Sequence, residues 1–187
     1  MPLTLTTPPA IEPLTLAEAK AHLKIDVADD DAPIAAMIAA ARARAEWHTG
    51  RALIAQGWTL HLDAWPCDGI VEIPLPPLQS VTSVTSYARD DTALTVDPSF
   101  YTVDTASAPA RLALRLGVVP PVNLRAIDAV RIAFTAGYGD TEAAVPELLK
   151  QAIREIVAFL YENRGEPPAE LPLAALALLE PYRVLKL

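Results

Sequence analysis

Residues 129–161 read AVRIAFTAGYGDTEAAVPELLKQAIREIVAFLY, and the spacing of the apolar side chains changes within this stretch. Up to Phe134, apolar residues alternate with others, as in a half-buried strand. From Pro146 to Tyr161 they recur at every third or fourth position, which predicts a helix with one buried face. That face consists of Leu149, Ile153, Ile156, Val157 and Leu160. A strand followed by a long helix, which we expect Asn163-Arg-Gly165 to end, indicates a mixed α and β protein.

Gly137-Tyr-Gly139 lies between this strand and this helix, where nucleotide-binding proteins hold phosphate groups. A Walker-type loop requires a Lys-Ser/Thr pair just inside the helix, and the sequence has none. A dinucleotide fingerprint requires a third glycine and a parallel βαβ unit, which are also absent. Pro146 suits the first turn of the helix and stands well beyond Gly139. We therefore interpret the two glycines as part of a turn.

Two further helices are expected nearer the N-terminus. Thr15-Leu-Ala-Glu18 is a capping box and begins a helix over residues 16–25. Asp29, Asp30 and Asp31 precede a second helix, from about Pro33 to Thr49, which Gly50 ends. The apolar stripe of the second helix consists of Ile34, Met37, Ile38, Ala41 and Ala45. The aspartates could hold a metal ion, but acidic residues at a helix start complement its dipole, and we favour that interpretation.

Between these helices and the long one, the apolar period is two. We expect strands over residues 58–62, 71–73, 80–87, 101–103, 111–114 and 129–134, with a turn at Pro120-Pro121 among others. The prediction is an α+β fold: a small bundle of about three to four helices with an antiparallel β insert. The expected organisation is an extended, proline-containing arm at 1–14, a helical core at 15–165 with the insert at about 57–135, and a C-terminal tail at 166–187.

That tail begins with a proline-containing spacer, EPPAELP, and from Leu171 to Leu187 it holds seven leucines in 17 residues. A short helix is expected, ended by Pro181, and residues 182–187 alternate like a strand. The expected stripe of the helix is Leu173, Leu176 and Leu179, with Leu178 as a further candidate. The tail either folds onto its own core or docks onto a partner by helix packing or strand addition, and the spacer favours docking.

The composition of the chain disfavours several classes of protein. The chain has 187 residues, 52% of them hydrophobic, and a formal net charge of −8. No apolar run approaches the roughly 18 residues that span a bilayer, and the N-terminus lacks the basic segment of a signal peptide. The apolar surplus therefore lies either in the core or in contacts between chains. The negative charge disfavours a protein that wraps nucleic acid, because phosphate neutralisation requires clustered Lys and Arg.

No residue pattern indicates catalysis, a metal ion or a cofactor. Cys67 is the single cysteine, which excludes a disulfide framework within the chain and a cysteine-built zinc site. His22, His48 and His61 lack zinc-binding spacing. No serine lies in a nucleophile elbow. We expect neither an enzyme nor a cofactor protein.

Five segments in a fixed order carry a resemblance to a known family. They are EPLTLAEAKAHLKID at 12–26, the stretch from DDDAPIAAM to LHLDAWP at 29–66, IPLPPLQSVTSVTSY at 73–87, the stretch from AVRIAF to ENRG at 129–165, and LPLAALALLEPYRV at 171–184. Together they make the chain similar to the head–tail connector (adaptor) proteins of tailed bacteriophages and phage-like gene transfer agents. The resemblance covers roughly residues 12 to 184, although none of the segments is diagnostic alone.

The resemblance implies a structural virion protein at the head–tail junction, present in the host cytoplasm during assembly. Family members form a ring of about twelve subunits between the portal and the tail stopper, and the ring extends the DNA channel. DNA would pass without sequence-specific binding, and no membrane is involved. In relatives the C-terminal segment engages the portal. The portal-binding residues implied here are Leu176, Leu179, Pro181, Tyr182, Arg183 and Val184.

Two alternatives and one hypothesis about the channel accompany this interpretation. The chain could instead be a monomeric cytoplasmic α+β binding module, which a stable monomer with an ordered tail would favour. It could also be a metal-dependent or hydrolytic enzyme, for which only Asp29–Asp31 and the histidines offer support. If the chain does form a ring, its acidic residues are hypothesised to face the channel and to repel DNA phosphates, so that the duplex slides.

Overall fold

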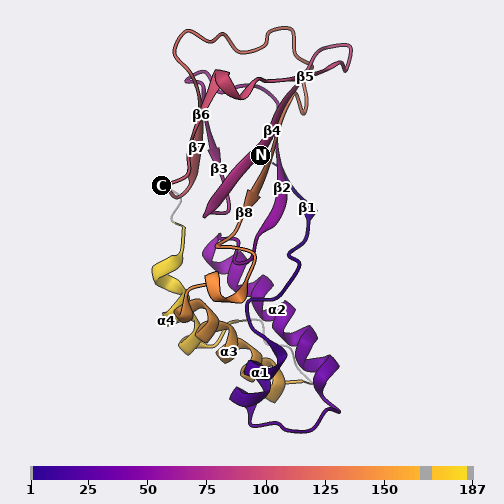
Figure 1. The fold of residues 1–187 in the computed structure, drawn as a ribbon, viewed down its shortest axis with the longest axis vertical. Helices are drawn as coiled ribbons and strands as arrows, with labels where there is room; N and C mark the ends of the chain where they lie inside the picture. Colours follow the sequence, from indigo (N-terminus) through magenta and orange to yellow (C-terminus); the bar gives the residue numbers. More distant parts are fainter. Residues whose placement is uncertain (1, 165–169, 185–187) are drawn as a thin grey trace. The chain divides into compact units, whose positions relative to one another are not determined.

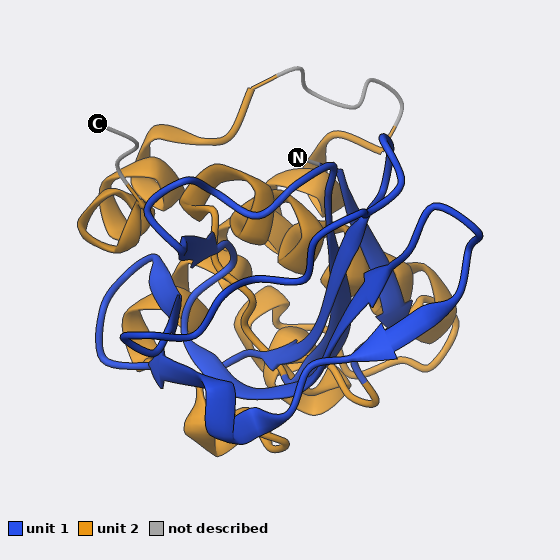
Figure 2. Cartoon of the chain, turned by 90° about the horizontal axis from the view of Figure 1, so that it is seen from above, with its two compact units in different colours: residues 1–9, 55–137 blue, residues 10–54, 138–187 orange. Residues whose placement is uncertain are grey.

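The computed structural model describes residues 2–164 and 170–184, and the chain divides into two compact units (Figures 1 and 2). Unit 1 comprises residues 1–9 and 55–137 and contains the β-strands. Unit 2 comprises residues 10–54 and 138–187 and contains the α-helices. Helices and antiparallel strands thus form separate parts of the fold, which confirms the α+β class.

Unit 1 contains two antiparallel sheets. The first has five strands in the order β1 (Leu3–Thr7), β2 (Gln56–Leu62), β8 (Val130–Ala136), β4 (Leu78–Tyr87) and β5 (Ala93–Thr95). The second has three strands in the order β3 (Ile70–Ile73), β7 (Ala110–Leu114) and β6 (Tyr101–Asp104). A short 3₁₀ turn, Pro98–Phe100, precedes β6. Each of the six predicted strands is present.

The central strand of the larger sheet is β8, the strand with which the sequence stretch 129–161 begins. It pairs with β2 on one side and β4 on the other. Every second residue of β8 is buried, from Val130 through Ile132 and Phe134 to Ala136. This alternation follows from the two-residue repeat of a strand, and it confirms the predicted period.

The N-terminal residues, expected as an extended arm, form the edge strand β1, which pairs with β2. Pro2 lies just before β1, and Pro8 and Pro9 lie just after it, so the prolines flank the ladder of hydrogen bonds without interrupting it. The alternation Leu-Thr-Leu-Thr at residues 3–6, which the prediction did not use, is the local signal for this strand. The other strand absent from the prediction is β5, which has three residues.

Unit 2 contains α1 (Leu16–Leu23), α2 (Asp31–Thr49), α3 (Glu147–Glu162) and α4 (Leu173–Leu179). The capping box at the start of α1 is present: the Glu18 amide donates to the Thr15 hydroxyl, and the Thr15 amide donates to the Glu18 carboxylate. α2 begins two residues before the predicted start and ends at Gly50, whose φ of 68° is left-handed. α3 ends at Glu162, next to the predicted stop at Asn163-Arg-Gly165. Gly165 itself, most of the spacer and residues 185–187 lie outside the described residues.

The core of unit 2 is built from the predicted apolar faces of α2 and α3. It includes Ile34, Ile38, Ala41 and Ala45 from α2, and Leu149, Ile153, Ile156 and Val157 from α3. Met37 and Leu160, also predicted, are partly buried against it. The small alanine side chains of α2 allow neighbouring elements to approach closely.

A partly buried ion pair links α1 to α3. The Lys150 ammonium lies 2.8 Å from a Glu18 carboxylate oxygen, and Lys150 is itself buried. Burial alone would raise the pKa of Glu18, but hydrogen bonds from Lys150 and Thr15 outweigh this and lower the pKa to about 2. The charge of Glu18 is therefore kept at neutral pH, and it balances the buried ammonium.

Candidate functional site

The two glycines and two of the three aspartates that suggested a ligand in the sequence have structural roles. Gly137 has a φ of 135°, and a Cβ on Gly139 would lie 2.6 Å from the Cβ of Ala144, so both glycines serve a tight turn after β8. Asp30 accepts a 2.6 Å hydrogen bond from the Tyr161 hydroxyl, and Asp31 pairs with Lys20 at the start of α2. Within residues 2–164 and 170–184, no group of three potential metal ligands lies together.

The C-terminal segment, defined here as residues 173–184, packs on unit 2. α4 inserts Ala175 and Leu179 into the core, and Tyr182 is partly buried against it. A 3₁₀ turn, Glu180–Tyr182, follows α4, so the described part of the predicted strand at 182–187 is not a strand. The Arg51 Nε donates to the Tyr182 carbonyl at 2.5 Å, and the Val184 amide donates to the Thr49 carbonyl at 2.8 Å.

The six residues implied as the portal contact therefore differ in accessibility. Leu179 is fully buried, and Tyr182 and Val184 are partly buried. Leu176 is partly buried as well, and Pro181 and Arg183 are exposed. Arg183 lies 3.5 Å from Glu180, an exposed ion pair that contributes little to stability. The outward surface of the segment thus presents Pro181 and Arg183, together with the exposed parts of Leu176, Tyr182 and Val184.

A second apolar surface lies in unit 1, on the β7–β8 loop, residues 115–129. Its side chains Leu116, Val119, Val122 and Ile127 are between 71% and 105% exposed. Such a group of exposed aliphatic side chains on one irregular loop makes the loop a candidate contact surface. The sequence predicted a turn at Pro120-Pro121 but gave no sign that its neighbours would face solvent, because the segment has no apolar period.

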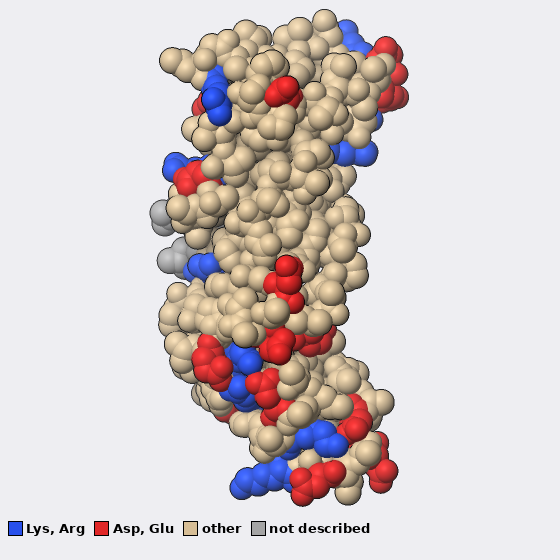
Figure 3. Space-filling view, viewed as in Figure 1, with Lys and Arg blue, Asp and Glu red and all other residues tan. Residues whose placement is uncertain are grey.

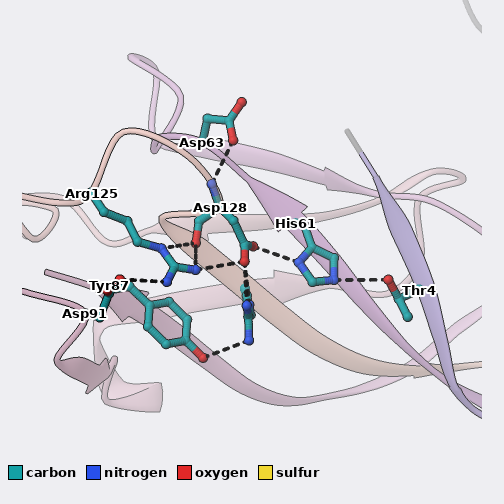
Figure 4. Close-up of polar contacts among 8 residues, drawn as sticks. Thr4, His61, Asp63, Tyr87, Asp91, Arg125 and Asp128 are labelled. Atoms are coloured by element: carbon teal, nitrogen blue, oxygen red, sulfur yellow. Dashed lines mark hydrogen bonds and ion pairs between the residues drawn. The ribbon is translucent and has the colours of Figure 1, made fainter. Parts of the chain in front are cut away.

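The C-terminal end of this loop is fixed by a cluster of polar side chains around Asp128 (Figure 4). One Asp128 carboxylate oxygen accepts from His61 Nδ1 at 2.7 Å, and the other accepts from Arg125 and Arg131 at 2.8 and 2.5 Å. The Asp128 amide donates to Asp63 at 2.8 Å. We call this the Asp128 cluster; its members are Thr4, His61, Asp63, Tyr87, Asp91, Arg125, Asp128 and Arg131.

The electrostatics of the cluster favour the ionised carboxylate. The hydrogen bond from Arg131, followed by that from His61, lowers the pKa of Asp128 to about 2 despite some burial. Arg125 and Arg131 also stack on the ring of Tyr87, at 4.2 and 4.7 Å from its centroid. Since Asp128 and Asp91 already pair with these arginines, the cluster holds the loop in place rather than offering an anion site.

Charges on the face of the molecule that Figure 3 draws are mixed in sign. Acidic and basic side chains are interspersed there, and neither sign forms a continuous patch. Cys67 is exposed. Among the described residues, no helix combines the length and the apolar character that crossing a membrane requires.

Comparisons with known proteins identify the family. The family model of the phage gp6-like head–tail connector protein matches residues 13–112. No curated protein sequence matches the chain significantly. A chain in the neck of an empty gene transfer agent particle, computed with C6 symmetry, is 29% identical, with a TM-score of 0.86. That match covers 100% of this chain and 97% of the other.

Two further solved structures agree. A chain of the native gene transfer agent virion is 30% identical with a TM-score of 0.84, and one of the native neck, computed with C12 symmetry, is 30% identical with a TM-score of 0.82. Both matches again cover 100% of this chain and 97% of the other. The resemblance read in the sequence is confirmed: the chain belongs to the gp6-like head–tail connector family of structural phage proteins.

Proposed function

We propose that the chain is a connector subunit at the head–tail junction of a phage or phage-like particle, where it forms a ring between the portal and the tail stopper and extends the DNA channel. The observation that carries this proposal is the full-length match, at about 30% identity, to chains of gene transfer agent necks and virions. A ring of about twelve copies is supported by the C12 symmetry of one of those necks.

The portal contact is assigned to the outward surface of the C-terminal segment. Leu176, Pro181 and Arg183 offer an apolar and a cationic group, while the buried Leu179 holds the segment on its own unit. Tyr182 and Val184 contribute through their exposed edges. The contact is thus made by a preformed surface, which costs less conformational entropy than a tail that orders on binding.

A second contact, with the tail stopper, is assigned to the β7–β8 loop. Its aliphatic side chains suit an apolar protein surface, and its arginines are already paired within the Asp128 cluster. DNA passes through the ring without being gripped, in keeping with the net charge of −8. We propose that acidic residues line the channel, and a cryo-EM map of the ring with a mainly basic lumen would refute this.

The experiment is a tagged pull-down from cells that produce the particle, read by mass spectrometry. The native chain is expected to recover a portal protein and a stopper protein. A chain carrying Pro181→Ser and Arg183→Glu is expected to lose at least about tenfold of the portal recovery. Lys24→Glu, a charge reversal at an exposed residue elsewhere in unit 2, is the matched control. Both variants change exposed side chains, so both chains should remain folded.

The results separate the possible functions. Recovery of neither partner by the native chain, together with a stable monomer, would favour a cytoplasmic α+β binding module. Normal portal recovery by the double variant would leave the connector function in place and remove the C-terminal segment as the portal contact.

A further inference from the structure

Trp47 projects from α2 with 87% of its surface exposed, more than any other aromatic side chain whose exposure the structure describes. The residues that precede it on the same side of the helix, Ala43, Ala40 and Ala36, are exposed as well and uncharged. The opposite side of α2 lies in the core of unit 2. A helix that is apolar on both sides is typical of one that is covered on both sides. Tryptophan is also the side chain most enriched at the centres of protein interfaces.

The same unit contains a hollow of suitable size for one large side chain. Its volume is about 300 Å³, and its apolar lining is formed by Ile11, Leu14, Leu16, Ala35 and Ile38. Leu14 and Ile38 belong to the packed core, so the floor of the hollow is fixed. Glu12 and Glu142 also border it. An apolar hollow at the small end of the range for ligand pockets suits a single aromatic ring.

The two features cannot meet within one chain. Both involve α2, because its residues Ala35 and Ile38 line part of the hollow and Trp47 lies more than three turns after Ala35. This places Trp47 about 18 Å further along the helix and about 120° around its axis. A projecting group and a complementary hollow that face different directions on one subunit define a head-to-tail contact, and repetition of such a contact closes a ring when the rotation allows.

We propose that Trp47 of one copy inserts into this hollow on the next copy, so that α2 contributes to both sides of the lateral contact in the ring. This inference rests on the proposed connector function. A second copy is favoured as the occupant because the necks that hold similar chains have C6 and C12 symmetry, which requires repeated contacts between neighbours. DNA is disfavoured, since Glu142 at the border of the hollow would repel its phosphates and the other acidic group, Glu12, pairs with Arg42 within the same chain.

The test is photo-crosslinking in assembled particles. Trp47 is replaced by p-benzoylphenylalanine, a bulky aromatic photo-crosslinker, and purified particles are irradiated and analysed by peptide mass spectrometry. The expected product is a dimer of this chain in which position 47 is joined to the segment 11–16 or 35–38 of another copy. The same crosslinker at Leu173, which is 84% exposed, is the matched control and should not join to those segments.

Other results overturn the inference in distinguishable ways. If the chain is present in particles but position 47 joins to a different protein, to other segments or to nothing, the connector function stands and the lateral contact is wrong. If the native chain, without any substitution, is absent from particles, both proposals fail. In addition, Trp47→Ser is expected to reduce the copies of the chain per particle at least about tenfold, and Trp47→Phe to reduce them less. Neither change should alter the melting temperature, because Trp47 is exposed.

Discussion

The β7–β8 loop and the C-terminal segment are both rich in aliphatic residues, but the loop exposes these side chains and the C-terminal segment buries part of them. The loop exposes Leu116, Val119, Val122 and Ile127, although backbone hydrogen bonds hold it at residues 123–125 and the Asp128 cluster holds its end. The C-terminal segment buries Ala175 and Leu179 in the core of unit 2. The segment that the sequence marked as the docking element is therefore largely part of its own unit.

The difference lies in the spacing of the apolar residues. In α4, Ala175 and Leu179 are four positions apart and lie on one side of the helix, so both reach the same core. In the loop, Pro120 and Pro121 prevent a helix, and no strand partner orders the segment between residues 115 and 122. The content of aliphatic residues thus does not distinguish a core element from an exposed surface, whereas the spacing of these residues along the chain does.

The largest expected effect comes from breaking the core contact of the C-terminal segment. Leu179→Ala should lower the free energy of unfolding by about 3 kcal/mol, because it removes a fully buried side chain and leaves a cavity. Leu173→Ala in the same helix is the matched control and should change stability by less than about 0.5 kcal/mol. Urea denaturation followed by circular dichroism measures both. Equal, small effects would mean that the segment does not pack on unit 2 in solution.

The β7–β8 loop, in contrast, is expected to depend on the Asp128 cluster for its stability. Asp128→Asn should lower the free energy of unfolding at pH 7 by about 1–2 kcal/mol, because the carboxylate accepts charge-assisted hydrogen bonds from Arg125 and Arg131. The substitution keeps the shape of the side chain and removes its charge. Denaturation at pH 7 is the measurement, and no change would show that the cluster does not stabilise the loop.

This stabilisation should disappear in acid. The pKa of Asp128 is lowered to about 2 from an ordinary value of 3.8, so the folded state favours the charged form. Its contribution is fully present above about pH 5 and is lost as the pH falls towards 2. The stability difference between the native chain and Asp128→Asn should therefore shrink across that range. A difference that stays constant from pH 7 to pH 3 would contradict this assignment.

A smaller effect is expected at the anchor of the C-terminal segment. Arg51→Met should lower stability by about 1 kcal/mol, since it removes the hydrogen bond to the Tyr182 carbonyl and keeps most of the aliphatic stem. The Val184 amide, which donates to Thr49, should then exchange its hydrogen faster. Hydrogen exchange read by mass spectrometry provides the measurement, and unchanged protection would show that α4 alone holds the segment.

Much of the fold was predictable because its signals are local. The capping box at Thr15 and Glu18, the stop at Gly50 and the alternation in β8 each depend on a few neighbouring residues, and all are present. The partner of β1 was not predictable in the same way. Nothing local shows that residues 3–7 pair with residues 57–60, because the pairing joins distant parts of the chain.

The contact surfaces were less predictable for the same reason. The Asp128 cluster joins Thr4, His61, Tyr87 and Asp128, which are scattered through the sequence and meet only where their strands come together. The leucine-rich C-terminus indicated an apolar segment, but the sequence alone does not show which of its leucines face the core. The resemblance gave the family, and the structure divided the implied portal residues into buried and exposed ones.

The smallest effect on stability is expected when the exposed aliphatic side chains of the β7–β8 loop are made polar. This change is also the sharpest test of the difference between the loop and the C-terminal segment. Replacing Leu116, Val119, Val122 and Ile127 by serine should change the free energy of unfolding by less than about 0.5 kcal/mol in total, because these side chains bury little apolar surface. The same variant should lose at least about tenfold of the stopper recovered in the pull-down, while portal recovery stays at the native level. A large loss of stability would instead show that the loop packs on unit 1 in solution, and unchanged recovery of the stopper would remove the loop as its contact.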